Sequence, residues 1–149
     1  MAYKVVEINE INTGPKAAIG VKFPFNAPGV FRKSFTTDEQ ASTNIKSLLL
    51  TRKGERYEQP NFGTDLLNVL FEPMTDGIKE FIETTITDAV NFWLPYIKIE
   101  NIDIDISGND EITAYKVKIS LNFIVTKTGS EQVITIFANE EGIIRIEEG

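Results

Sequence analysis

The residues that could do chemistry in this chain are carboxylates, lysines and hydroxyl groups, because it contains no histidine and no cysteine. Their absence excludes a Ser-His-Asp or Cys-His nucleophile, a disulfide framework and a metal held by imidazole or thiolate. The remaining catalytic arrangement is a glycosidase-like pair of carboxylates about 5 to 9 Å apart. Catalysis would therefore require that the fold bring two such carboxylates together.

Asp103 and Asp105 could form such a pair, since both would lie on one face of a strand. Residues two apart on any strand are separated by about 6 to 7 Å, so this spacing arises without any catalytic role. The pair more simply indicates a solvated strand face. Glu55, Glu58 and Glu72 flank a loop and a short apolar segment. A carboxylate there could equally pair with a nearby arginine or accept backbone N–H bonds.

No cofactor or ligand site is indicated elsewhere. Residues 109–111 lack the ligand spacing of a calcium loop, and no glycine-rich phosphate loop is present. We therefore expect no metal, no cofactor and no small-molecule substrate.

The charge balance argues against nucleic acid and membrane partners. The formal net charge is −7, and the densest basic cluster is Arg52-Lys53 with Arg56 nearby. Clustered lysine and arginine bind phosphates and anionic lipid, so an acidic chain is repelled by both. Residues 1–8 lack the apolar run of a signal peptide, and no segment approaches the roughly 20 apolar residues of a membrane span. We expect a soluble protein made in the cytoplasm.

The order of the expected elements predicts an α+β fold. A chain of 149 residues suits one domain, which we divide into an N-terminal arm (1–36), a helical half (37–95) and an antiparallel sheet (97–147). Two main helices and a short one would pack on a C-terminal meander of three or four strands. The arm would be extended or form short strands across the domain, or it would order only against a partner.

The first main helix is predicted over about 38–51. Two overlapping capping boxes begin it, Thr36 with Glu39 and Thr37 with Gln40. Apolar residues then follow at helical spacing, which predicts one buried face.

The second main helix, 78–93, is the clearest element. Its apolar face recurs at helical spacing at Ile78, Phe81, Ile82, Thr85, Ile86, Ala89, Val90 and Trp93. Thr75 or Asp76 would cap its N-terminus, and Pro95 would end it. Its polar face is acidic, which argues against a membrane-surface role. A shorter helix over 66–71 would stop before Pro73.

Beyond residue 96 the apolar period changes from 3.6 to 2, which predicts strands. The isoleucines of 97–99 alternate in the opposite phase to those of 102–106. A β-bulge is therefore expected near Glu100 and Asn101. Further strands are expected over 115–125, 133–138 and 143–146.

The segment 44–73 carries a more specific pattern. It reads N-I-K-S-L-L-L-T-R-K-G-E-R-Y-E-Q-P-N-F-G over 44–63 and L-F-E-P over 70–73. It resembles the phage baseplate wedge family that includes the sheath initiators of T4-like tails and the matching baseplate subunit of type VI secretion systems. The positions that carry the resemblance are Gly54, Glu55, Arg56, Pro60, Phe62, Gly63, Leu70, Phe71, Glu72 and Pro73.

Within this pattern, Gly54 is expected to end the first helix in the left-handed C′ conformation. Gly63 permits and Pro60 stiffens the turn beside Glu55 and Arg56. We expect this loop to hold the two main helices in register.

The resemblance implies a structural protein of the virion tail baseplate, made in the host cytoplasm. Its implied partners are wedge proteins and the tail sheath protein, with the tail tube as a further option. Members of the family dock the wedge core through a Glu-Pro-Arg triplet at the end of the long helix. Here that place is held by Leu94, Pro95 and Tyr96, so docking there would be apolar and aromatic. Leu94 and Tyr96 could equally close the core.

The resemblance also implies that the C-terminal sheet starts sheath assembly, because sheath subunits link to one another by exchanged strands. The candidate pairing strand is Val133, Ile134, Thr135, Ile136, Phe137 and Ala138, which is apolar or β-branched on both faces. On a sheet edge, such a strand would invite pairing by another chain. The alternative is a buried central strand.

Two rival functions stay open. One is a secretion-system baseplate subunit of the same fold. The other is a peptidoglycan hydrolase that uses two carboxylates, and the acidic net charge disfavours it because the cell wall is anionic.

Overall fold

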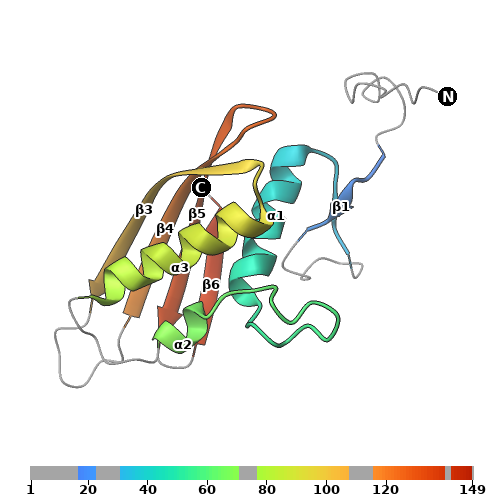
Figure 1. The fold of residues 1–149 in the computed structure, drawn as a ribbon. Coiled ribbons are helices and arrows are strands. Elements are labelled where there is room, and N and C mark those ends of the chain that lie inside the picture. Colours follow the sequence, from blue (N-terminus) through green and yellow to red (C-terminus); the bar gives the residue numbers. More distant parts are fainter. Residues whose placement is uncertain (1–16, 23–30, 71–76, 108–115, 140–141, 149) are drawn as a thin grey trace.

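The computed structural model describes residues 17–22, 31–70, 77–107, 116–139 and 142–148, and it confirms an α+β fold. A four-stranded antiparallel sheet forms one layer, and α3 lies across one of its faces (Figure 1). The strands are β3 (Ile97–Ser107), β4 (Lys116–Val125), β5 (Ser130–Asn139) and β6 (Gly142–Glu148). Their order in the sheet is β3-β4-β5-β6, which confirms the predicted meander.

The strands are held in register by rows of apolar side chains that face the helices. Ile104 pairs with Ile119, Ile119 pairs with Ile136, and Ile136 pairs with Ile146. The first three are buried and Ile146 is partly buried against them. Because the side-chain period of a strand is 2, a slip of one residue would turn this whole row toward solvent.

A β-bulge in β3 lies where the sequence predicts it. The pairing of β3 with β4 shifts register between Ile99 and Asn101. The extra residue reverses the phase of the strand, so that Ile97 and Ile104 both reach the buried face.

The helix α3 (Ile78–Trp93) supplies the second wall of the core. Its buried residues recur every four positions: Ile78, Ile82, Ile86 and Val90. The prediction that Phe81 belongs to the buried face is wrong, because its side chain is 53% exposed. Phe81 directly precedes Ile82 of the buried series and so points to the flank of the helix.

Neighbouring residues determine where α3 begins and ends. Leu94 leaves the helical region, with φ −127° and ψ 59°, as expected for the residue before Pro95. At the other end the N-cap is Gly77, which makes no side-chain capping bond. The predicted caps, Thr75 and Asp76, lie outside the described residues.

The helix α1 (Thr37–Leu50) begins with one of the two predicted capping boxes. Thr36 Oγ1 accepts a hydrogen bond from the Glu39 backbone N–H at 3.3 Å. The second box, Thr37 with Gln40, is wrong: the Gln40 side chain accepts from the Ser34 hydroxyl instead. Gln40 is therefore used to hold the preceding strand against the helix.

That preceding strand belongs to a small antiparallel hairpin of β1 (Gly20–Val21) and β2 (Lys33–Ser34). The described part of the N-terminal arm thus forms short strands, one of its predicted forms. An ion pair between Lys22 and Glu39 ties the hairpin to α1. The same bond, helped by the Phe35 backbone N–H, lowers the pKa of Glu39 below its ordinary value of 4.5.

A short helix, α2 (Leu66–Leu70), follows the loop after α1 and confirms the third predicted helix. Leu66 is fully buried, and α2 lies against α3 and β6. Three pattern positions that follow it, Phe71, Glu72 and Pro73, lie outside the described residues. No helix of the described residues is both long and apolar enough to cross a membrane.

Candidate protein-interaction site

The loop between α1 and α2, residues 51–65, positions the candidate site. The helix α1 ends at Leu50, and Thr51 leaves it in an extended conformation, with φ −86° and ψ 127°. The prediction that Gly54 is the C′ residue of this helix is therefore wrong. Gly54 does have a positive φ of 86°, but it uses it inside the loop, where its N–H donates to Pro60 O at 2.6 Å.

The extended exit of Thr51 allows the two ends of the loop to bond to each other. The Thr64 N–H donates to Thr51 O at 2.9 Å, and the buried Thr64 hydroxyl donates to Leu49 O at 3.2 Å. Gly63 has a φ of 116°, and a Cβ at this position would lie 2.3 Å from Thr51 O. Only glycine fits where the two strands of the loop approach this closely.

The polar pattern residues of the loop bind within it and to α1. Glu55 accepts a hydrogen bond from the Arg52 backbone N–H at 2.9 Å, one of the structural roles expected for it. Arg56 donates to the Ser47 hydroxyl of α1 at 3.1 Å. Glu55 and Arg56 are thus engaged in local structure, and both are exposed.

A stack of three side chains runs from the loop to α3. Arg56 Cζ lies 3.7 Å from the centroid of the Phe62 ring. The Phe62 ring meets the Trp93 ring edge-on, with centroids 5.2 Å apart. Since Arg56 also reaches Ser47 on α1, this stack joins both main helices through the loop. These contacts support the prediction that the loop holds the two main helices in register. The free energy that they contribute to folding stays a prediction.

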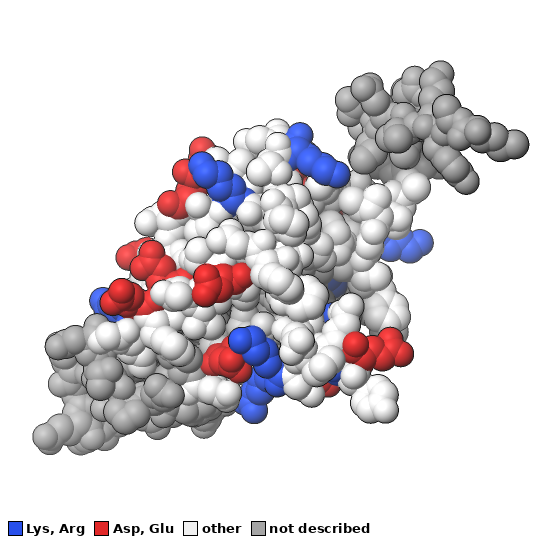
Figure 2. All heavy atoms as spheres, in the orientation of Figure 1, with Lys and Arg blue, Asp and Glu red and all other residues white. Residues whose placement is uncertain are grey.

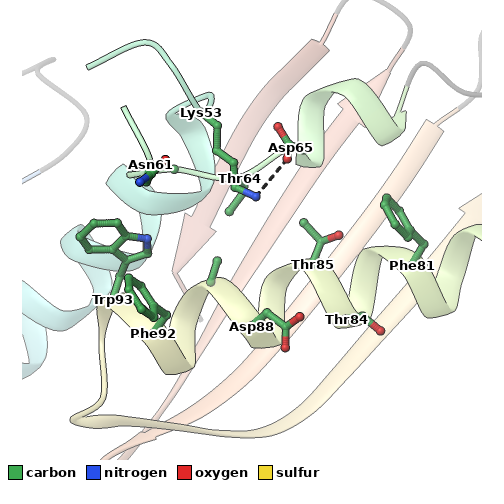
Figure 3. Close-up of a pocket in the computed structure, with 12 residues that line it drawn as sticks. Lys53, Asn61, Thr64, Asp65, Phe81, Thr84, Thr85, Asp88, Phe92 and Trp93 are labelled. Atoms are coloured by element: carbon green, nitrogen blue, oxygen red, sulfur yellow. Dashed lines mark ion pairs between the residues drawn. The ribbon is translucent and has the colours of Figure 1, made fainter. Parts of the chain in front are cut away.

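A groove of about 460 Å³ lies between this loop and α3 (Figure 3). Its walls are Lys53, Asn61, Gly63, Thr64 and Asp65 on the loop side and Phe81, Thr84, Thr85, Asp88, Ala89, Phe92 and Trp93 on the helix side. Trp93, the α3 member of the stack with Arg56 and Phe62, is one of these lining residues. We call this feature the loop–α3 groove.

Two phenylalanine rings lie at opposite ends of the helix wall of the loop–α3 groove (Figure 3). Phe81 is 53% exposed and Phe92 is 75% exposed. Removing an apolar side chain of this size from water is worth about 1.5 to 3 kcal/mol when it becomes fully buried. Two such rings beside one groove therefore form a surface that a partner could cover favourably.

The charges around the groove are predominantly negative. Lys53 forms an ion pair with Asp65 at 3.0 Å, so its charge is locally balanced. Asp88 lines the groove, is exposed, and has no ion-pair partner among the described residues. Figure 2 shows acidic side chains gathered over the surface formed by α3, to which the exposed Glu80 and Glu83 belong.

The candidate docking triplet is mostly turned inward. Leu94 is 7% exposed and packs in the core. The Tyr96 hydroxyl accepts a hydrogen bond from the Asn44 side chain at 2.7 Å, and its backbone oxygen accepts from the Thr126 N–H at 3.0 Å. Pro95 alone of the three is exposed. Of the two interpretations of Leu94 and Tyr96, this geometry favours closing the core.

The candidate pairing strand is not a free edge. Residues 133–138 belong to β5, which pairs with β4 on one side and with β6 on the other. Ile134, Ile136 and Ala138 are buried toward the helices, whereas Val133, Thr135 and Phe137 are partly covered on the opposite face. Two hydrogen-bonded neighbours make β5 a central strand. The edges of the sheet are β3 and β6.

The carboxylates considered for catalysis do not form a site. Asp103 and Asp105 are exposed on the outer face of β3, opposite Ser120 and Lys118 of β4. Glu72 and the segment 109–111 lie outside the described residues. No group of three or more potential metal ligands occurs in the described part of the chain. The arrangement of the described residues offers contacts to a partner molecule.

The loop–α3 groove is the feature that the sequence did not predict. The sequence places Asp88 on the acidic polar face predicted for residues 78–93, and it indicates no role for Phe92. The sequence does carry a signal for this surface, because Phe92 falls outside the buried series of α3. An aromatic side chain exposed on a helix often belongs to an interaction surface. The opposite wall comes from a loop whose path is set by bonds between Thr51 and Thr64, which periodicity does not reveal.

Comparison with known proteins identifies relatives of this chain. Residues 37–130, from α1 to the start of β5, match the model of a family described as baseplate wedge protein gp25. No curated protein matches the chain.

Three solved structures share the fold. A candidate tail lysozyme from Geobacter sulfurreducens has a TM-score of 0.60 and 20% identity, covering 70% of this chain and 91% of that one. A subunit of the baseplate of the anti-feeding prophage has a TM-score of 0.58 and 16% identity, over 70% of this chain and 82% of that one. A subunit of the baseplate of pyocin R2 after contraction has a TM-score of 0.50 and 17% identity, over 58% and 82%. At these identities the likeness establishes the fold alone.

Proposed function

The chain belongs to the baseplate wedge protein gp25 family, which gives it a structural role in a baseplate among other baseplate proteins, and we propose that it starts the tail sheath there. In this proposal it docks on the wedge core through its helical half and offers the edge of its sheet to the first sheath subunits. The observation that carries the proposal is the family match, which spans α1, the α1–α2 loop, α3 and two strands of the sheet.

The proposed sheath contact moves from residues 133–138 to β6. Among the described residues, the edges of the sheet are β3 and β6. β3 carries an exposed Lys98–Glu100 ion pair, a bulge, and the exposed Asp103 and Asp105, and β6 likewise carries charged residues and a register shift against β5. Charges and bulges discourage pairing on either edge, so β6 is chosen because it adjoins β5, the strand that holds residues 133–138. An exchanged sheath strand would therefore add to β6 by backbone hydrogen bonds.

Proline substitution tests this contact without relying on side chains. Successive residues of an antiparallel edge strand direct their N–H groups alternately to the partner and outward. One of Glu147→Pro and Glu148→Pro should therefore spare the β5–β6 bonds, and a retained melting temperature identifies it. That variant should no longer form ordered sheath when mixed with the sheath and wedge proteins encoded beside this chain, as seen by electron microscopy. Normal sheath growth on it would reject β6 as the template.

We propose further that the protein has no catalytic activity. The likeness to a candidate tail lysozyme is one of fold, and the exposed Asp103 and Asp105 face solvent and Lys118. Glu39 is held ionised by its lowered pKa, which opposes proton donation. Purified protein should therefore leave cell-wall preparations intact, and lysis abolished by Asp103→Asn would support a hydrolase instead. Genes for a phage tail or a secretion system beside this one would distinguish the two structural settings.

A further inference from the structure

We propose that the loop–α3 groove binds a short segment of another baseplate protein, in which a large apolar side chain is flanked by lysine or arginine. The inference rests on the proposed function, since it takes the partner from the baseplate. It adds the binding site and the chemistry of the segment.

The shape of the groove suits a peptide segment. Phe81 and Phe92 are eleven positions apart on α3, which corresponds to about 16 Å along a helix. This length matches about three turns of a bound helix or about five residues of an extended strand. The groove volume of about 460 Å³ between them falls in the range of about 300 to 1,000 Å³ that is typical of recognition pockets.

The two rings define what the segment must carry at its centre. Phe81 and Phe92 are both more than half exposed, while Ala89 between them is small and partly buried. An apolar side chain inserted over Ala89 would contact Phe92 and Trp93, while Phe81, eight positions earlier on α3, would be covered by another part of the segment. Binding energy at protein interfaces concentrates in such aromatic contacts, and the surrounding residues mainly exclude water.

The charges define what flanks that side chain. Asp88 stands on the same wall with no ion-pair partner among the described residues, and Lys53 opposite is already paired with Asp65. Exposed Glu80 and Glu83 extend the negative surface along α3. A lysine or arginine in the segment would find Asp88, whereas an acidic segment would be repelled.

The same charges disfavour a second copy of this chain as the occupant. The net charge is −7, so two copies approaching through α3 would bring like charges together. The segment is therefore expected from a different protein whose local sequence is basic and apolar.

Trp93 provides a direct probe of binding. It is the only tryptophan of the chain and it lines the groove. Labelled peptides of about 15 residues, tiled across the baseplate proteins encoded beside this chain, would be titrated by fluorescence anisotropy. Tryptophan-free peptides that bind should also shift the emission of Trp93. Peptides that join large apolar residues to lysine or arginine should bind, and acidic peptides should not.

Matched variants locate the contact. Phe92→Ser should weaken binding about tenfold or more, as truncation of a central aromatic contact does. Asp88→Lys should weaken it about two- to fivefold at low salt and less at high salt, as expected for an exposed ion pair. Tyr57→Ser and Glu131→Lys are the controls, since Tyr57 is fully exposed elsewhere and Glu131 is exposed on β5, outside the groove. Circular dichroism should show all four folded.

Three outcomes would overturn the inference. Equal weakening by the control variants would show that the groove is not the site. Full-length baseplate proteins that bind wild type and a Phe92→Ser, Asp88→Lys double variant equally would reject the groove while the proposed function stands. Dimerisation of the pure protein that Phe92→Ser abolishes would make a second copy the occupant. If no baseplate protein binds any form of the chain, the proposed function itself fails.

Discussion

Replacing Arg56 by alanine should loosen the hold of the α1–α2 loop on both main helices. The guanidinium group lies 3.7 Å from the centroid of the Phe62 ring and donates to Ser47 at 3.1 Å. Phe62 in turn meets Trp93 of α3 at a centroid distance of 5.2 Å. The substitution removes the first two of these contacts and leaves the third.

The size of the effect follows from the two lost contacts. An exposed cation–π contact is worth about 0.5 to 1 kcal/mol, and a hydrogen bond about 0.5 to 1.5 kcal/mol. Because Arg56 is exposed, we expect a loss of about 1 to 2 kcal/mol of unfolding free energy. For a protein of this length, each kcal/mol lowers the melting temperature by about 2 to 4 °C. The expected decrease is therefore about 2 to 8 °C.

Thermal and urea unfolding, followed by circular dichroism, measure this loss. The matched control is Arg52→Ala, since Arg52 is an exposed arginine of the same loop whose side chain forms no ion pair or ring contact among the described residues. It should change the melting temperature little. Arg56→Lys should recover part of the loss, because lysine keeps the charge without the planar group. An Arg56→Ala protein that melts with wild type, or an equal loss in the control, would refute the register role.

Three further predictions concern stability. Since the folded-state pKa of Glu39 lies below 4.5, its ionised form stabilises the fold above about pH 4.5. That contribution should vanish as the pH falls through the folded-state pKa, and Glu39→Gln should flatten the melting temperature over this range. Gly63→Ala should cost at least about 3 kcal/mol in urea unfolding, because φ is 116° and a Cβ would clash with Thr51 O. Gly54→Ala, with a φ of 86° but open space around the Cβ, should cost only about 1 to 2 kcal/mol. Thr135→Pro should destabilise by about 3 kcal/mol or more, because Thr135 pairs on both sides; a normal melting temperature would contradict its central position.

The elements that the sequence predicts well are those whose signal is local. The bulge at Ile99/Asn101 is predicted by the isoleucines on either side of it, which alternate in opposite phase. The end of α3 at Leu94 follows from the conformation that Pro95 imposes on its neighbour. In both cases the deciding interaction lies within a few residues, so reading the chain in order is sufficient.

The errors arise where a distant partner decides. Two capping boxes overlap at the start of α1, and the choice between them depends on the hairpin, because Gln40 binds Ser34 of β2. Gly54 looks like a helix terminator, yet the helix ends earlier, because Thr51 bonds with Thr64 at the far end of the loop. Local propensity offers several acceptable solutions at these places, and tertiary contacts select one.

The location of the sheet edge is the error with the greatest functional consequence. A strand that is apolar on both faces can be a central strand or an interface, and its sequence alone does not distinguish the two. In the structure β5 is a central strand, since it pairs with β4 on one side and with β6 on the other. Among the described residues, the edges of the sheet are instead β3 and β6. Both edges carry charges and a register shift that oppose pairing, so these features do not distinguish them; we propose β6 because it adjoins β5. The loop–α3 groove is built from other elements, α3 and the α1–α2 loop, so wedge binding and sheath templating would use separate surfaces and need not compete.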